Sequence, residues 1–356
     1  MKEISKILEE DFEQIYSTKS IDWQILANKR ILITGATGLI GSNLVNALLY
    51  ANEVYKANIN IVPLVRDIEK AKKRFISDKN LEILTGSIEK PIDYAQNVDY
   101  IVHAASPTSS KYFITNPVET IKSSITGTTN LLDFAKEKNV TGFVFLSSME
   151  VYGNPERGEV VTEEKVAGFD PYNVRNCYPM SKKLCESLCR SYFSEYSVPT
   201  KVIRLTQTFG PGVEYGDGRI FAEFMRCVIE NRDIILKTKG ETERCYLYTA
   251  DAVTSILTVL LNGKPGEFYT AANPETYCSI AQMAELIAKE IAQNKIKVQY
   301  ILEDITKLGY ANTLYMNLNT TKLQQLGWTP KTKLKQMDSK NLMIRLFRLE
   351  NGIQVS

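Results

Sequence analysis

Short apolar runs alternate with longer amphipathic stretches through residues 29–205 of the chain. The apolar runs are too short for helices and predict buried strands, at 30–34, 59–65, 81–84, 100–103, 143–147 and 200–205. Apolar residues recur at helical spacing between these runs, over 38–50, 67–75, 117–137 and 178–196. Strands that alternate with helices pair in parallel and are covered by helices on both faces. We therefore expect an α/β fold, a doubly wound parallel sheet of the Rossmann type.

The pattern changes on either side of this first domain, 29–205. Residues 1–28 are amphipathic and predict a helical N-terminal extension. Downstream of the domain, glycine and proline become frequent and the elements shorten, which predicts a smaller mixed α/β domain over 206–330, interleaved with the first. Residues 331–356 are basic and predict a helical tail.

Composition and charge argue against several classes of protein. Lys and Arg number 43 and Asp and Glu 41, a formal net charge of +2, which does not favour a nucleic-acid-binding protein. The only histidine, His103, has no partners at metal-ligand spacing, so we expect no metal site. The six cysteines form no secreted disulfide framework. No apolar run is long enough to cross a membrane and the acidic N-terminus is unlike a signal peptide. We therefore expect a soluble cytoplasmic protein.

A glycine-rich segment joins the first predicted strand to the first predicted helix. In this position Gly35 permits a tight turn, Gly38 lets backbone N–H groups approach a pyrophosphate, and Gly41 lets the helix pack closely on the strand. The positive end of the helix then faces the anion. The segment therefore predicts a dinucleotide site made by Gly35, Thr37, Gly38, Leu39, Ile40 and Gly41.

The end of the second predicted strand bears on the choice between NAD and NADP. NAD-binding proteins often place an acidic residue there to accept the ribose 2′-hydroxyl, whereas this chain has Val65 followed by Arg66. An arginine can hold a 2′-phosphate and favours NADP. Asp67 could serve instead if the strand is longer, and Arg66 could equally be a solvated charge at the start of a helix.

Four residues have the spacing and chemistry of a catalytic group. Tyr178 and Lys182 share one face of a predicted helix, and a nearby ammonium lowers the pKa of a phenol, so that the phenolate can take a proton from a hydroxyl. Ser148 and Glu150 follow the predicted strand 143–147, whose carboxyl end faces the ligand site in such folds. Ser148 is placed to bind the same oxygen, and Glu150 to remove a proton from carbon beside a ketone.

These motifs together resemble the extended short-chain dehydrogenase/reductases of the nucleotide-sugar epimerase/dehydratase family. The resemblance covers roughly residues 29–330. Within the family, the sequence most resembles the UDP-glucuronate decarboxylases. It is carried by the glycine segment, the Tyr-x-x-x-Lys pair and the stretches 103–107, 116–122, 147–153, 174–178, 209–211 and 217–219. Residues 29–205 would accordingly bind NAD(P), and residues 206–330 the substrate.

The resemblance implies a role for each of these groups. Tyr178 is the base for oxidation at C4 of the sugar, Lys182 binds the nicotinamide ribose, Ser148 assists, and Glu150 is the base of the second stage, after the 4-keto sugar forms. The cofactor would be a tightly bound NAD(P), with the self-recycling class favouring NAD, and the substrate a nucleotide-diphosphate sugar used for surface polysaccharides. Other implied cofactor residues are His103, Ala104 and Ala105, and implied substrate residues are Ser106, Ser148, Met149, Gln207, Arg219 and Arg244.

Family members usually dimerise through two long helices in each subunit. The resemblance therefore implies a homodimer through the helices predicted near 117–137 and 178–196, and light scattering would show a monomer if this is wrong.

Some positions depart from the family pattern. Met149 stands where related decarboxylases have serine and some dehydratases have aspartate, Gln207 replaces a usual asparagine, and Ser87 replaces an aspartate that often contacts adenine. Decarboxylation and dehydration of the 4-keto sugar therefore both stay open. The alternatives are a nucleotide-sugar 4-epimerase, an NADPH-dependent 4-keto-sugar reductase and a non-catalytic NAD(P)-binding protein.

Overall fold

A seven-stranded sheet is the centre of the molecule, with all of its strands parallel. The computed structural model describes residues 2–75, 78–303 and 313–340. The strand order is β11-β7-β5-β4-β1-β2-β3. The bounds are β1 (Arg30–Thr34), β2 (Asn60–Val65), β3 (Leu84–Thr85), β4 (Tyr100–His103), β5 (Gly142–Ser148), β7 (Thr200–Leu205) and β11 (Phe268–Ala271). The chain leaves β1 toward β2 and later returns to β4 on its other side, so the order reverses between β1 and β4. This confirms the expected doubly wound fold.

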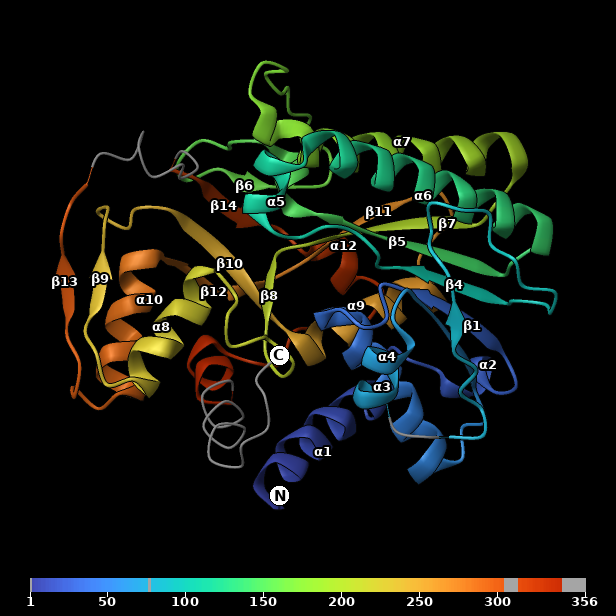
Figure 1. The fold of residues 1–356 in the computed structure, drawn as a ribbon, viewed down its shortest axis with the longest axis horizontal. Helices are drawn as coiled ribbons and strands as arrows, with labels where there is room; N and C mark the ends of the chain where they lie inside the picture. The colour runs from blue at the N-terminus through green and yellow to red at the C-terminus, as the bar shows by residue number, and fades with distance from the viewer. Residues whose placement is uncertain (1, 76–77, 304–312, 341–356) are drawn as a thin grey trace.

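Helices cover both faces of this sheet (Figure 1). On one face, α6 (Pro117–Lys138) and α7 (Cys177–Tyr196) pack against each other and against Phe143 and Phe145 of β5. On the other face, α3 (Leu39–Tyr55) and α9 (Thr249–Asn262) pack on Val144 and Leu146 of the same strand. Because both faces are buried, the central strands are apolar at almost every position, which is why the sequence shows continuous rather than alternating apolar runs.

A second, mixed sheet lies beside the first (Figure 1). Its order is β12-β10-β14-β6, with β8 also paired to β10. The bounds are β6 (Val160–Val161), β8 (Gln207–Phe209), β10 (Glu243–Tyr248), β12 (Asn273–Ser279) and β14 (Tyr315–Leu318). A separate parallel pair, β9 (Ile234–Leu236) and β13 (Val298–Tyr300), lies beside helices α8 (Ile220–Ile229) and α10 (Ile280–Leu286).

The path of the chain is more interwoven than a boundary at residue 205 suggests. Strand β11 and helix α9 follow that residue, yet they pack in the first sheet and on its face. Strand β6 precedes it, yet pairs with β14 of the second sheet. The predicted strand 81–84 is reduced to Leu84–Thr85, with one isolated bridge at Leu81, because only its end reaches β2.

The N-terminal extension is helical at α1 (Lys2–Tyr16) and α2 (Trp23–Leu26). Helix α1 packs on α3 and α9, and it buries Asp11 rather than an uninterrupted apolar face. The Tyr248 hydroxyl donates to Asp11 over 2.6 Å, and Lys340 forms an ion pair with the same carboxylate. Residues 334–340 of the predicted helical tail are helical, and 341–356 lie outside the described residues.

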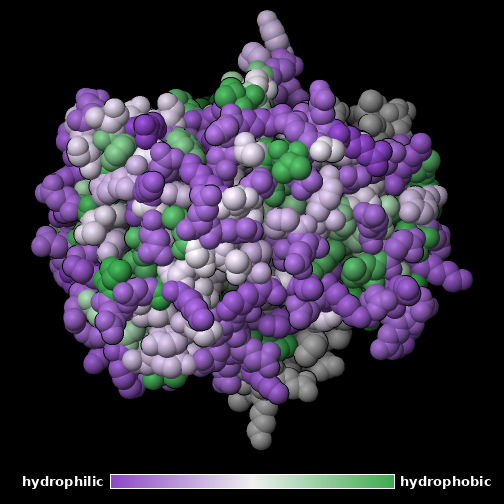
Figure 2. Space-filling model, turned by 180° about the vertical axis from the view of Figure 1, so that it is seen from behind, coloured by the Kyte–Doolittle hydropathy of each residue, from purple (hydrophilic) through white to green (hydrophobic). Residues whose placement is uncertain are grey.

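The outer surface is mostly polar. The face opposite to that of Figure 1 is hydrophilic, with apolar residues in small separate groups (Figure 2). On α6 and α7, Val118, Ile121, Met180 and Leu184 are exposed, and the expected dimer through these helices stays a prediction. Over the residues that the structure describes, no helix is long and apolar enough to cross a membrane. All six cysteines are free thiols.

Candidate active site

A large cavity opens at the carboxyl ends of β1, β4, β5 and β7. Its volume is about 2170 Å³, whereas pockets for one small ligand span about 300–1,000 Å³. Its lining includes the glycine segment, Tyr178 and Glu150, and Arg244 of β10. The cavity therefore has room for a dinucleotide and a second ligand side by side.

The glycine segment has the geometry of a phosphate loop. Gly35 has a φ of +65°, and a Cβ there would lie 2.6 Å from the backbone of Ala104. A Cβ on Gly41 would lie 2.3 Å from the carbonyl oxygen of Gly35, so the first turn of α3 packs directly on the loop. Gly38 is the N-cap of this 17-residue helix and no side chain caps it, so the first N–H groups of α3 remain available to an anion. The segment fits a dinucleotide pyrophosphate.

Three cations border the cavity beyond the end of β2. Arg66, Lys70 and Arg74 line it, the last two on α4 (Ile68–Arg74), together with Ser87. Glu214 reaches them from the loop before α8, at 3.1 Å from Arg74 and 3.6 Å from Lys70. Asp67 is turned away, because its carboxylate accepts the Lys70 N–H as the cap of α4. Strand β2 ends at Val65, so the longer strand under which Asp67 was expected to serve does not form.

His103 lies behind the cavity rather than on its wall. Its Nδ1 is 2.8 Å from the Thr34 hydroxyl and its Nε2 3.2 Å from that of Thr128, so the ring joins β1, β4 and α6. Burial, with the nearby Lys182 charge, lowers the pKa of His103 to about 3, and the ring is neutral. The predicted cofactor residues Ala104 and Ala105 and the predicted substrate residue Ser106 do line the cavity, whereas His103 shapes the strand end that carries them.

Tyr178 and Lys182 lie in the first turns of α7, against the end of β5. The Tyr178 ring stacks on Phe113 of α5 (Ser110–Thr115) at 4.2 Å and is 8 % exposed. The Lys182 ammonium donates to the Leu146 carbonyl oxygen over 2.7 Å. The two side chains therefore share one face, as the spacing predicts, with the phenol opening into the cavity.

The expected lowering of the Tyr178 pKa by Lys182 is wrong for this geometry. Burial and the negative charge of Glu150 raise the pKa of Tyr178, while a hydrogen bond with Ser148 and the charge of Arg175 oppose that rise. Lys182 is bound to backbone instead, and burial lowers the pKa of its own ammonium to about 8. Of the groups around Tyr178, the Ser148 hydroxyl and the Arg175 charge therefore lower the pKa of its phenol.

Glu150 has a partner that the sequence analysis missed. Arg175 holds its carboxylate with two parallel hydrogen bonds, Nη1 to Oε2 at 2.6 Å and Nη2 to Oε1 at 3.1 Å. Arg175 comes from the short turn Val174–Asn176 just before α7. Its place three residues before Tyr178 was a usable signal, because a residue that close to the predicted catalytic tyrosine is expected to lie near the same cavity.

The three positions that depart from the family pattern behave differently. Met149 lines the cavity, but its sulfur accepts a hydrogen bond from Thr206 at 3.2 Å and its side chain packs in an apolar cluster. Gln207 lines the cavity and accepts a 2.8 Å hydrogen bond from Arg244. The Nε of Arg244 is buried with no hydrogen-bond partner, which marks a donor that a ligand can satisfy. Ser87 lies beside the three cations.

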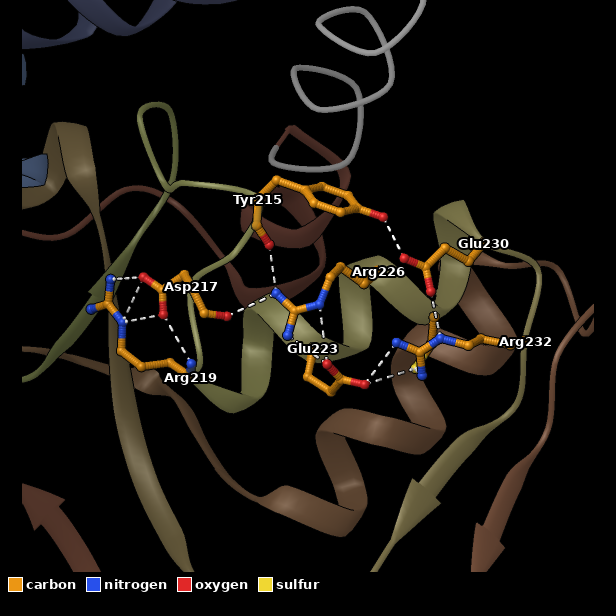
Figure 3. A network of polar contacts seen from close by, with 8 residues as sticks. Tyr215, Asp217, Arg219, Glu223, Arg226, Glu230 and Arg232 are labelled. Carbon is orange, nitrogen blue, oxygen red and sulfur yellow. Dashed lines mark hydrogen bonds and ion pairs between the residues drawn. The ribbon is translucent and has the colours of Figure 1, made fainter. Parts of the chain in front are cut away.

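Arg219 is carried by a loop that a network of ion pairs holds in place (Figure 3). Asp217 accepts from the Arg219 Nε at 3.0 Å. Arg226 of α8 donates to the Asp217 carbonyl oxygen at 2.8 Å and to that of Tyr215, and Glu223 binds Arg226 and Arg232. The network fixes Arg219 at the cavity wall before a ligand arrives, which reduces the entropy that binding costs.

Comparison with known proteins assigns the chain to a family. Residues 31–272 match the NAD dependent epimerase/dehydratase family. The chain belongs to that family. Membership confirms the expected resemblance and the expected class of enzyme, the NAD(P)-dependent short-chain dehydrogenase/reductases that decarboxylate, dehydrate or epimerise nucleotide sugars.

Two curated relatives in the epimerase/dehydratase family are decarboxylases. UDP-glucuronic acid decarboxylase 1 of Xenopus tropicalis is 30% identical over 323 residues, which is 90% of this chain and 73% of the relative. UDP-glucuronic acid decarboxylase 6 of Arabidopsis thaliana is 28% identical and covers 92% of this chain and 91% of its own.

Solved structures share the fold at lower identity. UDP-glucose 4-epimerase of Thermotoga maritima, solved with UDP-glucose, superposes with a TM-score of 0.75 at 21% identity, over 90% of this chain and 99% of its own. The dTDP-glucose 4,6-dehydratase of Bacillus anthracis, solved with NAD, superposes with a TM-score of 0.72 at 21% identity, over 90% of this chain and 98% of its own.

No group of three or more His, Cys, Asp or Glu residues within the described part of the chain could hold a metal ion.

Proposed function

We propose that this enzyme oxidises a nucleotide-diphosphate hexuronate at C4 and then decarboxylates it. The observation that carries the proposal is the placement of Glu150 and Tyr178 in the wall of one cavity, which the phosphate loop and Arg244 also line. The relatives of 28–30% identity, which bear the name UDP-glucuronic acid decarboxylase, support the uronate over a neutral sugar.

The side chains divide the work between two stages. Tyr178 takes the proton of the C4 hydroxyl with support from Ser148, and Lys182 is placed to bind the nicotinamide ribose. NAD(P), when bound, supplies the acceptor and later the donor of the hydride at C4. When the C5–C6 bond breaks and CO2 leaves, its electron pair passes to the C4 ketone and gives an enolate. The enolate then takes up one proton at C5, through Glu150, before the hydride returns to C4. Arg219 and Arg244 bind the diphosphate and the sugar.

Product masses from a panel of UDP-, CDP-, GDP- and dTDP-sugars test this function. We expect loss of CO2 from the glucuronate and no mass loss from the glucose of the same nucleotide. Glu150→Gln is expected to lower turnover at least about 10²-fold, the lower range for an acid–base group, while the exposed Glu164→Gln leaves it unchanged. Loss of water would identify a dehydratase, and full turnover of Glu150→Gln would remove the assigned role of that residue.

The cofactor site supports NADP over NAD. Arg66, Lys70 and Arg74 line this part of the cavity, Glu214 contacts the latter two, and a 2′-phosphate would add negative charge beside Arg66. We expect NADP⁺ to bind more tightly than NAD⁺, and Arg66→Ala to weaken NADP⁺ about 10-fold through loss of one charge-assisted contact, with no change for NAD⁺. Lys73→Ala, on α4 but off the cavity wall, is the matched control. Isothermal titration calorimetry measures both, and equal affinities would contradict the assignment.

A net reductase that consumes NADPH is the second candidate, and the same cations favour it. Purified protein that carries stoichiometric cofactor and turns over without added NADPH would exclude it.

A further inference from the structure

The ion pair between Arg175 and Glu150 is partly open to the cavity. The Arg175 side chain is 23 % exposed and that of Glu150 26 %, and both residues line the cavity. Both carboxylate oxygens of Glu150 accept a guanidinium hydrogen bond. Glu150 is thus restrained in the structure.

The surroundings keep Arg175 beside the reacting carbon. Asn173 caps the turn that carries it, accepting the Arg175 backbone N–H at 3.1 Å. Its guanidinium lies 5.5 Å from the centre of the Phe113 ring, and that ring stacks on Tyr178. Arg175 and Tyr178 therefore meet at the same ring and line the same cavity. If Tyr178 binds the C4 hydroxyl as proposed, the substituent at C5, which in a hexuronate is a carboxylate, comes within reach of this guanidinium.

The other cations of this wall have different partners. Lys182 donates to the Leu146 carbonyl oxygen, Arg244 to Gln207, and Arg219 to Asp217. Met149, in the place where related decarboxylases have serine, is turned into an apolar cluster and offers no donor. Arg175 is accordingly the cation best placed to meet a second carboxylate beside Tyr178.

We propose that Arg175 is the receptor for the C6 carboxylate of the substrate, and that this carboxylate displaces Glu150 from the guanidinium. The inference rests on the function proposed above and adds a source of specificity. A uronate brings its own anion, takes over the hydrogen bonds of Arg175 and leaves Glu150 unrestrained. A neutral hexose brings no anion, so Arg175 stays on Glu150. The enzyme thereby selects uronates by charge exchange rather than by pocket size.

Binding by two variants of opposite effect tests the exchange. Titrations of UDP-glucuronate and UDP-glucose use cofactor-loaded protein with Tyr178→Phe as background, so that no sugar is consumed. Arg175→Met is expected to weaken UDP-glucuronate about 10- to 100-fold, the range for a charge-assisted hydrogen bond, and to leave UDP-glucose within about twofold. Glu150→Gln is expected to strengthen UDP-glucuronate severalfold, because the competing carboxylate is gone.

The controls separate this role from a structural one. Arg157→Met removes an exposed ion pair with Glu243 outside the cavity and should change neither affinity. If Arg175→Met weakens both sugars equally, or if Glu150→Gln weakens UDP-glucuronate, the receptor role is wrong although the proposed function can still hold. If the Tyr178→Phe protein without a further substitution binds neither sugar more tightly than it binds UDP alone, both proposals fail.

Discussion

Replacing Tyr178 by phenylalanine is expected to lower turnover of the nucleotide sugar about 10²- to 10⁴-fold, the contribution of a positioned acid–base group. The substitution removes only the hydroxyl. The ring keeps its stacking on Phe113 at 4.2 Å and its burial, so the site around it should not collapse. Steady-state turnover with saturating sugar measures the effect, and the content of bound cofactor and the melting temperature should equal those of the wild type.

Tyr172 provides the matched control for this change. It lies six positions earlier in the chain and is 93 % exposed, so Tyr172→Phe should leave turnover unchanged. Retention of more than about a tenth of wild-type turnover by Tyr178→Phe would show that another group takes the C4 proton. Ser148, which shares a hydrogen bond with the phenol, would then be the next residue to test.

Arg204→Met is expected to destabilise the fold by about 3–5 kcal/mol, the cost of leaving one member of a buried ion pair alone. Arg204 of β7 binds Glu186 of α7 through Nε at 2.9 Å and Nη2 at 2.8 Å, and the side chains are 10 % and 5 % exposed. The guanidinium also packs over Tyr152 and Phe268. Chemical denaturation measures the change. Helix α7 carries Tyr178, so turnover should fall with stability.

A double variant tells charge from shape in this pair. Arg204→Met with Glu186→Leu removes both charges and should recover most of the lost stability, because the desolvation cost disappears with the attraction. Arg157→Met, which breaks an exposed pair, should cost less than about 1 kcal/mol. Equal losses of stability in Arg204→Met and Arg157→Met would refute the assignment of the Arg204–Glu186 pair as one that stabilises the fold.

The main sheet could be predicted from sequence because its strands are buried on both faces. Such strands leave continuous apolar runs, and six of the seven strands were predicted. Five of them have nearly the predicted bounds, whereas the observed β3 is shorter than predicted. The seventh, β11, was not assigned to this sheet, because its neighbour β7 lies far away in sequence. No local pattern encodes which sheet a short strand joins.

The candidate site likewise has features that depend on local sequence, which could be predicted, and contacts between distant elements, which could not. The glycine segment and the Tyr178–Lys182 spacing depend on backbone geometry within one turn, so sequence spacing predicts them. The Arg175–Glu150 pair and the Leu146 carbonyl that binds Lys182 join elements distant in the chain. Their effects on the Tyr178 pKa follow from burial and from charges brought together by folding, and single-sequence spacing contains neither.

Strand β6 from the first half of the chain pairs in the second sheet, and strand β11 from the second half pairs in the first sheet. This interleaving has a consequence for how such enzymes diversify. A recombination event with one crossover near residue 205 would separate β11 and α9 from the sheet they complete, and β6 from β14. A new sugar specificity therefore cannot arrive as a transferable module. It has to arise by substitutions within an intact chain, at positions such as Met149, Arg175 and Gln207, which line the cavity between the two sheets.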